Sequence, residues 1–158
     1  YQQGLTEPDP RDDLSGMDVA RKCVCLAREL GILIELEQVE ITPLLPSELM
    51  QGEVEDFLVN HQQMDAVFEP TIERIKNNNT KLAYVGSISQ ETGIKIQLQE
   101  VTQSSAFYNL SGTDNMVIFH TQRYDACPLI VQGPGPGADV TATGVFAVAL
   151  GLVEKLYD

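Results

Sequence analysis

An acidic segment with two prolines leads directly into a helix near the start of the chain, and this junction constrains the fold more than any other feature. The segment 6–22 reads TEPDPRDDLSGMDVARK. Because proline fixes φ and disfavours the helical region for the residue before it, we expect Glu7 and Asp9 to lie in a stiff, extended loop. Ser15 is placed to cap a helix. That helix is expected to end at Gly31, since glycine suits the left-handed C′ position.

Asp18 and Lys22 lie four positions apart and therefore share one face of this helix. Glu7 and Asp18 are acceptor-only carboxylates that suit an α-ammonium group. Lys22 can donate a proton, and Asp13 can orient it or join the same network. The alternative is a helix cap with an exposed ion pair worth roughly 0.3–0.5 kcal/mol. The pattern alone favours this alternative.

The middle of the chain predicts a strand followed by a long helix. Residues 36–45 mix β-branched and apolar side chains, which predicts a short strand or an extended crossover. Apolar residues at helical spacing predict a helix over 53–76 with one buried face, and Pro70 should kink or split it. His61 lies on the apolar stripe, so we interpret it as a hydrogen-bonded core residue in preference to a catalyst.

Two strand pairs and a last helix follow. Alternating apolar residues predict a hairpin with one buried face, and a polar connection after it is a surface loop or a lid. These features predict an α+β fold with a mixed, mainly antiparallel sheet packed against helices, in one domain over 1–158. The expected strands are 81–88, 94–101, 116–122 and 128–132, the connection is 103–115, and the last helix is 140–156.

Composition excludes several classes of partner. The net charge of −13 argues against nucleic acid and anionic membranes, which attract clustered Lys and Arg. Cys23, Cys25 and Cys127 are expected to be unpaired, small buried hydrophobes in a reducing cytoplasm. Two histidines and no CxxC pattern predict no metal site. We find no targeting segment or apolar run of membrane-spanning length.

Two segments of the chain resemble one enzyme family. The first is TEPDPRDDLSGMDVARK at 6–22, and the second is GPGPGADVTA at 133–142. Both are similar to segments of homoserine dehydrogenase, in particular the form fused to aspartokinase. The order of the expected elements also fits, so the resemblance covers nearly the whole chain.

This resemblance implies roles for individual residues. Lys22 falls on the family's catalytic lysine, and Glu7 and Asp18 fall on its substrate-binding acids. The implied reaction is the NAD(P)H-linked interconversion of L-aspartate 4-semialdehyde and L-homoserine, in threonine and methionine biosynthesis. Members of the family pair through a sheet, so a homo-oligomer is implied. Apolar residues of the second strand pair suit that contact or, alternatively, the core; they include Met116, Ile118 and Leu129.

The glycine-rich turn is weak evidence for a cofactor when taken alone, because its spacing differs from GxGxxG. Between a strand and a helix it offers N–H groups to an anion or a carboxamide, or it is simply a tight turn. The resemblance implies that Gly135 and Gly137 approach NADP or NAD, while Pro136 removes one N–H. We find no nucleotide-binding βαβ unit, so cofactor binding is expected mainly from an upstream domain.

We therefore expect the chain to be part of a longer polypeptide, with an aspartokinase portion in the parent and no dehydrogenase activity in the chain alone. Two other hypotheses remain open. One is a noncatalytic amino-acid-binding or assembly module. The other is an α+β interaction domain in which the acidic loop is only a rigid turn.

Overall fold

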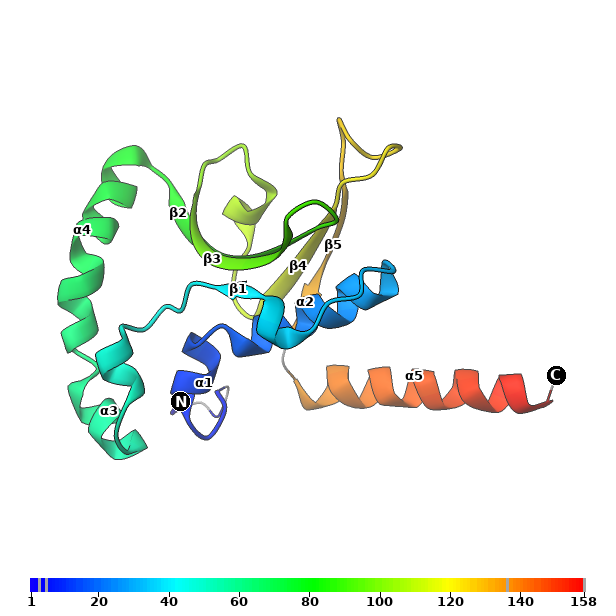
Figure 1. Cartoon of the computed structure of the whole chain (residues 1–158), viewed down its shortest axis with the longest axis horizontal. Coiled ribbons are helices and arrows are strands. Elements are labelled where there is room, and N and C mark those ends of the chain that lie inside the picture. Colours follow the sequence, from blue (N-terminus) through cyan, green and yellow to red (C-terminus); the bar gives the residue numbers. More distant parts are fainter. Residues whose placement is uncertain (3, 5, 136, 158) are drawn as a thin grey trace. The chain divides into compact units, whose positions relative to one another are not determined.

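The computed structural model describes residues 1–2, 4, 6–135 and 137–157. The chain divides into two compact units, Tyr1–Tyr108 and Asn109–Asp158. The N-terminal unit contains most of the secondary structure, and the C-terminal unit contains a strand pair and one long helix (Figure 1). The α+β class with mixed and antiparallel sheets is confirmed.

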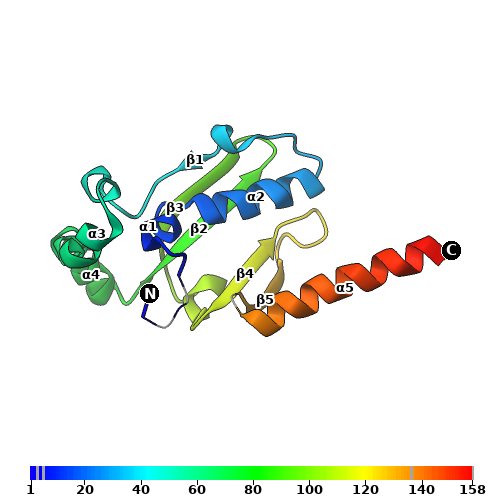
Figure 2. The ribbon, with the colours of Figure 1, turned by 90° about the horizontal axis from the view of Figure 1, so that it is seen from below.

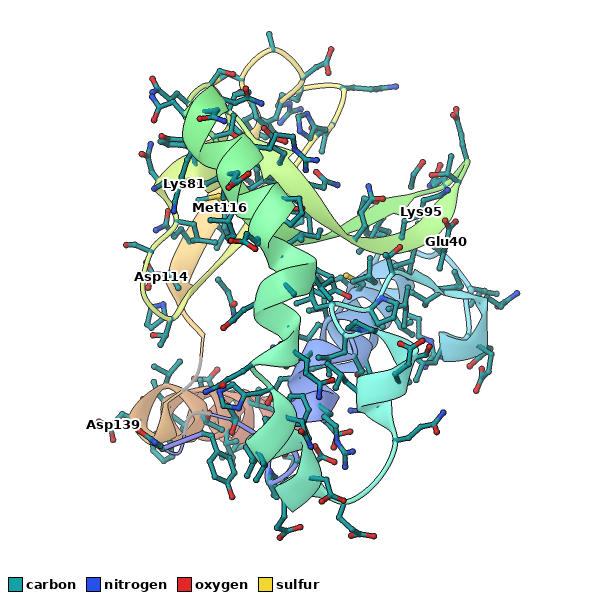
Figure 3. All side chains as sticks on the ribbon, turned by 90° about the vertical axis from the view of Figure 1, so that its left-hand side faces the viewer. Glu40, Lys81, Lys95, Asp114, Met116 and Asp139 are labelled. Atoms are coloured by element: carbon teal, nitrogen blue, oxygen red, sulfur yellow. The ribbon has the colours of Figure 1, made fainter. Side chains whose placement is uncertain are left out.

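A three-stranded mixed sheet organises the N-terminal unit. Strands β2 (Lys81–Ser89) and β3 (Gly93–Val101) form the predicted antiparallel hairpin. The two-residue strand β1 (Glu40–Ile41) pairs in parallel with β3, so the expected strand within 36–45 is present but short. Glu40 lies opposite Lys95 in this register, and their side chains form an ion pair of 2.9 Å (Figure 3). The 3-10 helix η1 (Leu36–Gln38) precedes β1.

The core lies between this sheet and helix α2 (Met17–Glu29), which runs along one face of the sheet (Figure 2). Ile94 and Ile96 alternate on the covered face of β3 and are both 1% exposed. Gly86 on β2 permits this close approach, because a Cβ there would collide with the Cys23 thiol. The buried side of α2 consists of small and branched residues, namely Ala20, Cys23, Val24 and Ala27.

The helix predicted over 53–76 is two helices, α3 (Val54–Asn60) and α4 (Gln63–Asn78). The break lies at His61, not at Pro70, which is inside α4. At the break the backbone forms hydrogen bonds of the i to i−3 type. The Met64 N–H donates to the His61 carbonyl at 2.9 Å, and the Asp65 N–H donates to the Gln62 carbonyl at 3.0 Å. These bonds replace the i to i−4 pattern, and so they interrupt the helix.

The expected burial of this helical pair is also wrong. Phe57 is buried, but none of the described side chains of α4 is. His61 is exposed, and its Nδ1–H donates to the Leu58 carbonyl at 2.7 Å, so it is hydrogen-bonded but is not a core residue. The physical reason is position, because α3 and α4 stand at the edge of the unit and do not cover the sheet (Figure 1).

The end of α4 and the connection after β3 are tied to the sheet by polar contacts. Glu100 accepts hydrogen bonds from Arg74 (3.0 Å), Asn78 (3.2 Å) and Thr80 (2.6 Å). The connection contains the 3-10 helix η3 (Ala106–Asn109). Lys81 Nζ on β2 donates to the Tyr108 carbonyl of this helix at 2.7 Å. The stretch predicted as a loop or lid is therefore an anchored loop at this point.

The C-terminal unit contains β4 (Asp114–Phe119) and β5 (Leu129–Pro134), an antiparallel pair as predicted, and helix α5 (Ala138–Tyr157). None of its described residues is buried. In the described part of the chain, no helix has the length and hydropathy that crossing a bilayer requires.

The cysteines are all free, but only Cys23 is buried, and burial raises the pKa of its thiol. The expected burial of Cys25 and Cys127 is wrong. Cys25 lies two positions after Cys23 on α2, which turns its side chain away from the sheet. Cys127 lies in the loop before β5 and is exposed.

Candidate functional site

The acidic segment folds into a short helix, α1 (Pro10–Leu14), where the sequence predicted only a stiff loop. Asp9 is extended, as expected before proline, with φ −100° and ψ 106°. Its carboxylate caps α1 by accepting the Arg11 N–H at 2.9 Å, and Pro10 occupies the first helical position, where its missing N–H costs nothing. The Glu7 N–H donates to Asp13 Oδ2 at 3.0 Å, so α1 holds these two site candidates together.

The turn into α2 differs from the predicted cap. Gly16, not Ser15, is the N-cap, with φ +84°. Ser15 Oγ still accepts the Met17 N–H at 3.1 Å, and it donates to the Asp12 carbonyl at 2.6 Å. Glycine is required at position 16 because the left-handed backbone disfavours side chains and because a Cβ would collide with the Tyr84 hydroxyl. The predicted C-terminal end is confirmed, since Gly31 follows α2 with φ +79°.

Asp18 and Lys22 form the predicted ion pair on the first turns of α2, with 2.7 Å between Asp18 Oδ2 and Lys22 Nζ. Their side chains remain 50% and 60% exposed. The opposite side of the helix packs on the sheet, which directs this pair toward solvent. The ion pair of Lys22 in the described part of the chain is with Asp18, whereas the Asp13 carboxylate accepts the Glu7 N–H. An ammonium, its carboxylate partner and a nearby acidic loop are thus all accessible to a polar molecule.

The glycine-rich turn connects β5 to α5. The Gly135 N–H donates to the Thr113 carbonyl at 2.9 Å, and a Cβ at Gly135 would collide with the Asn115 amide, so packing within the unit already requires this glycine. The Gly137 carbonyl accepts the Thr141 N–H at 3.0 Å and begins the helix. Among the described residues, a Cβ at Gly137 would meet the Val140 side chain, at 3.7 Å. Pro136 lies outside the described residues.

A groove of about 1290 Å³ in the N-terminal unit is lined by the start of the chain and by helices α3 and α4. It shares Thr6, Pro10 and Leu14 with the acidic segment and includes His61. Its described lining does not include the four charged site candidates, Glu7, Asp13, Asp18 and Lys22. The charged site candidates therefore lie beside this groove and do not line it.

Arg11 is a functional candidate that the sequence analysis missed. Its exposed fraction is 8%, and it is the one buried charged residue among the described residues. The signal that could have found it is the Asp9-Pro10-Arg11 order, which places a carboxylate and a guanidinium two residues apart at the start of a helix. No cluster of three or more His, Cys, Asp or Glu that could hold a metal ion occurs in the described ranges.

Comparisons with known proteins agree with this architecture. The family model described as homoserine dehydrogenase matches residues 1–149. The chain is 42% identical over 157 residues to bifunctional aspartokinase/homoserine dehydrogenase 1, chloroplastic, of Arabidopsis thaliana, covering 98% of the chain and 17% of that protein. It is 39% identical over 160 residues to homoserine dehydrogenase of Emericella nidulans, covering 97% of the chain and 44% of that protein.

Solved structures show the same fold. A Candida auris protein of unknown function superposes with a TM-score of 0.85 at 36% identity, covering 94% of this chain and 42% of that one. Homoserine dehydrogenase of S. aureus superposes with a TM-score of 0.69 at 16% identity, over 99% and 36% of the two chains, and shows the fold alone.

The fold and the site candidates define an α+β domain with an exposed ion pair beside an acidic segment. The family match over most of the chain settles its membership: the chain belongs to the homoserine dehydrogenase family. It spans less than half the length of these relatives.

Proposed function

We propose that this chain forms the substrate-binding, catalytic and dimerisation part of a homoserine dehydrogenase, which interconverts L-aspartate 4-semialdehyde and L-homoserine in threonine and methionine biosynthesis. The observation that carries the proposal is the exposed contact between Lys22 and Asp18, beside the helix that joins Glu7 to Asp13. In a chain of this family, these residues supply a proton donor and carboxylates at one end of one unit.

Reduction of the aldehyde requires a proton for the oxygen as the carbonyl carbon gains hydride. Lys22 is the proposed donor. In the structure its ammonium is neutralised by Asp18. When the α-ammonium group of the substrate binds Asp18, Lys22 loses part of this partnership and gains a neighbouring cation, and both changes favour release of its proton. Glu7 and Asp13 complete the acceptors for the substrate ammonium group.

The family implies NADP or NAD, which supplies hydride when bound. In this chain the Gly137 end of the turn fits such a group, because it lies at the start of a 20-residue helix and is open around the Cβ position. The Gly135 N–H is already bonded to Thr113, so we assign Gly135 a supporting contact only. Most of the cofactor contacts are proposed to come from a nucleotide-binding domain elsewhere in the protein.

A homo-oligomer through the β4 and β5 pair is part of the proposal. Leu129 is 46% exposed, and Met116 and Ile118 are half-buried, so the pair offers apolar area to a second copy. A Leu129→Lys variant should shift sedimentation toward the monomer. Free cysteines accord with a reducing compartment such as the cytoplasm. Bacterial and plant relatives are bifunctional by name, whereas the fungal relative is not, and we propose the fused form for this protein.

The test is homoserine-dependent reduction of NADP⁺ or NAD⁺ by the full-length protein carrying Lys22→Ala. Loss of the proton donor should lower kcat by about 10²- to 10⁴-fold, with a smaller change in KM. Arg21→Ala is the matched control, since it removes the same charge one position away on an exposed part of α2. Turnover of Lys22→Ala within a few fold of the parent would refute the role of Lys22. Binding of homoserine without any turnover by the parent would favour a noncatalytic amino-acid-binding module.

A further inference from the structure

The Arg11 side chain uses every nitrogen of its guanidinium within the protein. Nε donates to Asp9 Oδ1 at 2.9 Å and to Oδ2 at 3.0 Å, and Nη2 donates to Oδ2 at 2.6 Å. Nη1 donates to the carbonyls of Gly52 at 2.9 Å and Gln51 at 3.3 Å. Only 9% of the side chain is exposed, so this is a largely buried contact with several hydrogen bonds and not a surface ion pair.

The surroundings of the guanidinium are consistent with a permanent charge. Its central carbon lies 6.0 Å from the centroid of the Phe57 ring, which offers a cation–π contact. The hydrogen bonds from Arg11 lower the pKa of Asp9, and the same bonds from Asp9 raise the pKa of Arg11. Both groups therefore stay ionised across the physiological range, and the contact does not act as a pH switch.

This contact attaches the acidic segment to a distant part of the chain. Gln51 and Gly52 lie forty residues away, just before α3. The other end of α1 is attached to the same stretch, since the Leu14 carbonyl accepts the Leu44 N–H at 3.0 Å. Residues 44–52 thus hold α1 at both ends. Within the segment, the bond from the Glu7 amide to Asp13 links the loop before α1 to α1 itself.

The attachment of α1 also affects the acidic residues that precede it. Glu7 is itself exposed, and its backbone N–H donates to Asp13 on α1, the helix that Arg11 attaches to residues 51 and 52. We propose that Arg11, held by Asp9, is a positioning residue that fixes the loop from Glu7 to Asp13 in the geometry that binds the ammonium group of the amino-acid substrate. The inference rests on the proposed function. It assigns to Arg11 an effect on substrate affinity and none on proton transfer at Lys22.

Steady-state kinetics of the full-length protein with L-homoserine test this inference. In Arg11→Lys the charge remains but one ammonium cannot serve both Asp9 oxygens and two carbonyls. In Asp9→Asn the helix cap can persist while the ion pair is lost. Both variants should raise KM for homoserine about tenfold, as misplacement of a binding group does, and leave kcat within about threefold. Assays run well below the Tm of each variant separate this effect from unfolding.

Arg28→Lys is the matched control. Arg28 also binds a carboxylate, Glu35 at 2.7 Å, and a carbonyl, but it is 49% exposed and lies outside the acidic segment. Its KM should stay within about twofold of the parent. A lower Tm with unchanged KM in the Arg11 and Asp9 variants would overturn the inference, because the contact would then be structural only. An equal fall in kcat would also overturn it. A parent without turnover would refute the proposed function first, and the inference with it.

Discussion

The two units of the chain place their apolar residues in opposite ways. In the N-terminal unit, α2 is amphipathic and buries one side on the sheet, where Ile94 and Ile96 are 1% exposed. In the C-terminal unit, α5 carries apolar residues on all sides, and Phe146 and Val148 are 65% and 66% exposed. A helix that is apolar all round is normally covered in the native protein. The N-terminal unit therefore has a core of its own, whereas the described residues of the C-terminal unit leave these apolar side chains of α5 exposed.

The largest expected effect on stability comes from truncating a buried isoleucine, and an exposed isoleucine of the other unit is its control. Ile96→Ala should lower the free energy of unfolding by about 2–5 kcal/mol, because it leaves a cavity beneath α2. Ile130→Ala in β5, where the side chain is 43% exposed, should cost less than about 1 kcal/mol. Urea unfolding measures both. Equal losses would show that Ile130 is covered in solution and would reduce the contrast between the units.

Two glycine-to-alanine variants, one in each unit, should change the stability of the protein in opposite directions. Gly86→Ala should destabilise by about 1–3 kcal/mol, since the new Cβ collides with the Cys23 thiol. Gly144→Ala in α5 should stabilise by about 0.5–1 kcal/mol, because its Cβ meets nothing within 4 Å and alanine favours a helix. Thermal unfolding of the two variants gives both values. Destabilisation by Gly144→Ala would mean that another surface packs closely on this part of α5.

Acid should weaken the N-terminal unit through Glu100. Hydrogen bonds from Thr80, then Asn78 and Arg74, lower its pKa below the ordinary 4.5. Since the folded pKa is below the unfolded one, the stabilisation is present above the unfolded value and is lost as the pH falls through the folded value. Glu100→Gln should therefore lower Tm at pH 7 and make little difference in strong acid. A Tm difference that is independent of pH would show that the carboxylate charge is not what holds α4.

The smallest expected effect on stability belongs to the candidate site. Asp18→Asn should change the free energy of unfolding by less than about 0.5 kcal/mol, because the ion pair with Lys22 is exposed. Under the proposed function it should still raise KM for homoserine. A matched pair of urea unfolding and kinetic measurements would separate the two effects. A large loss of stability would place this pair with the structural contact of Asp9 and Arg11.

The sequence predicted most elements that depend on local pattern. Alternating residues located the hairpin of β2 and β3, and the Gly31 end of α2 followed from backbone freedom. Helix α1 was missed because a five-residue helix has almost no periodicity. The sequence predicts a kink or break at Pro70, because proline is a local signal, whereas the turn at His61 has no signal in the sequence.

The candidate site shows the same limit. The four-residue spacing was enough to predict the contact of Asp18 with Lys22, since both lie on one helix. The bond from the Glu7 amide to Asp13 and the burial of Arg11 could not be predicted, since each depends on how the acidic segment folds or on what packs against it. The catalytic role of Lys22 and the binding roles of Glu7 and Asp18 remain predictions, which the residues and the resemblance both support.

The sequence by itself determined the strand pairs, the end of α2, the charge and the family resemblance, because these depend on local periodicity and on contiguous motifs. Only the tertiary structure decided that Arg11 is buried against carbonyls forty residues away, that α4 lies uncovered, and that Gly86 and Gly16 are sites of close approach. The reason is physical: burial and close contact depend on which surfaces meet, and segments distant in the chain contribute those surfaces.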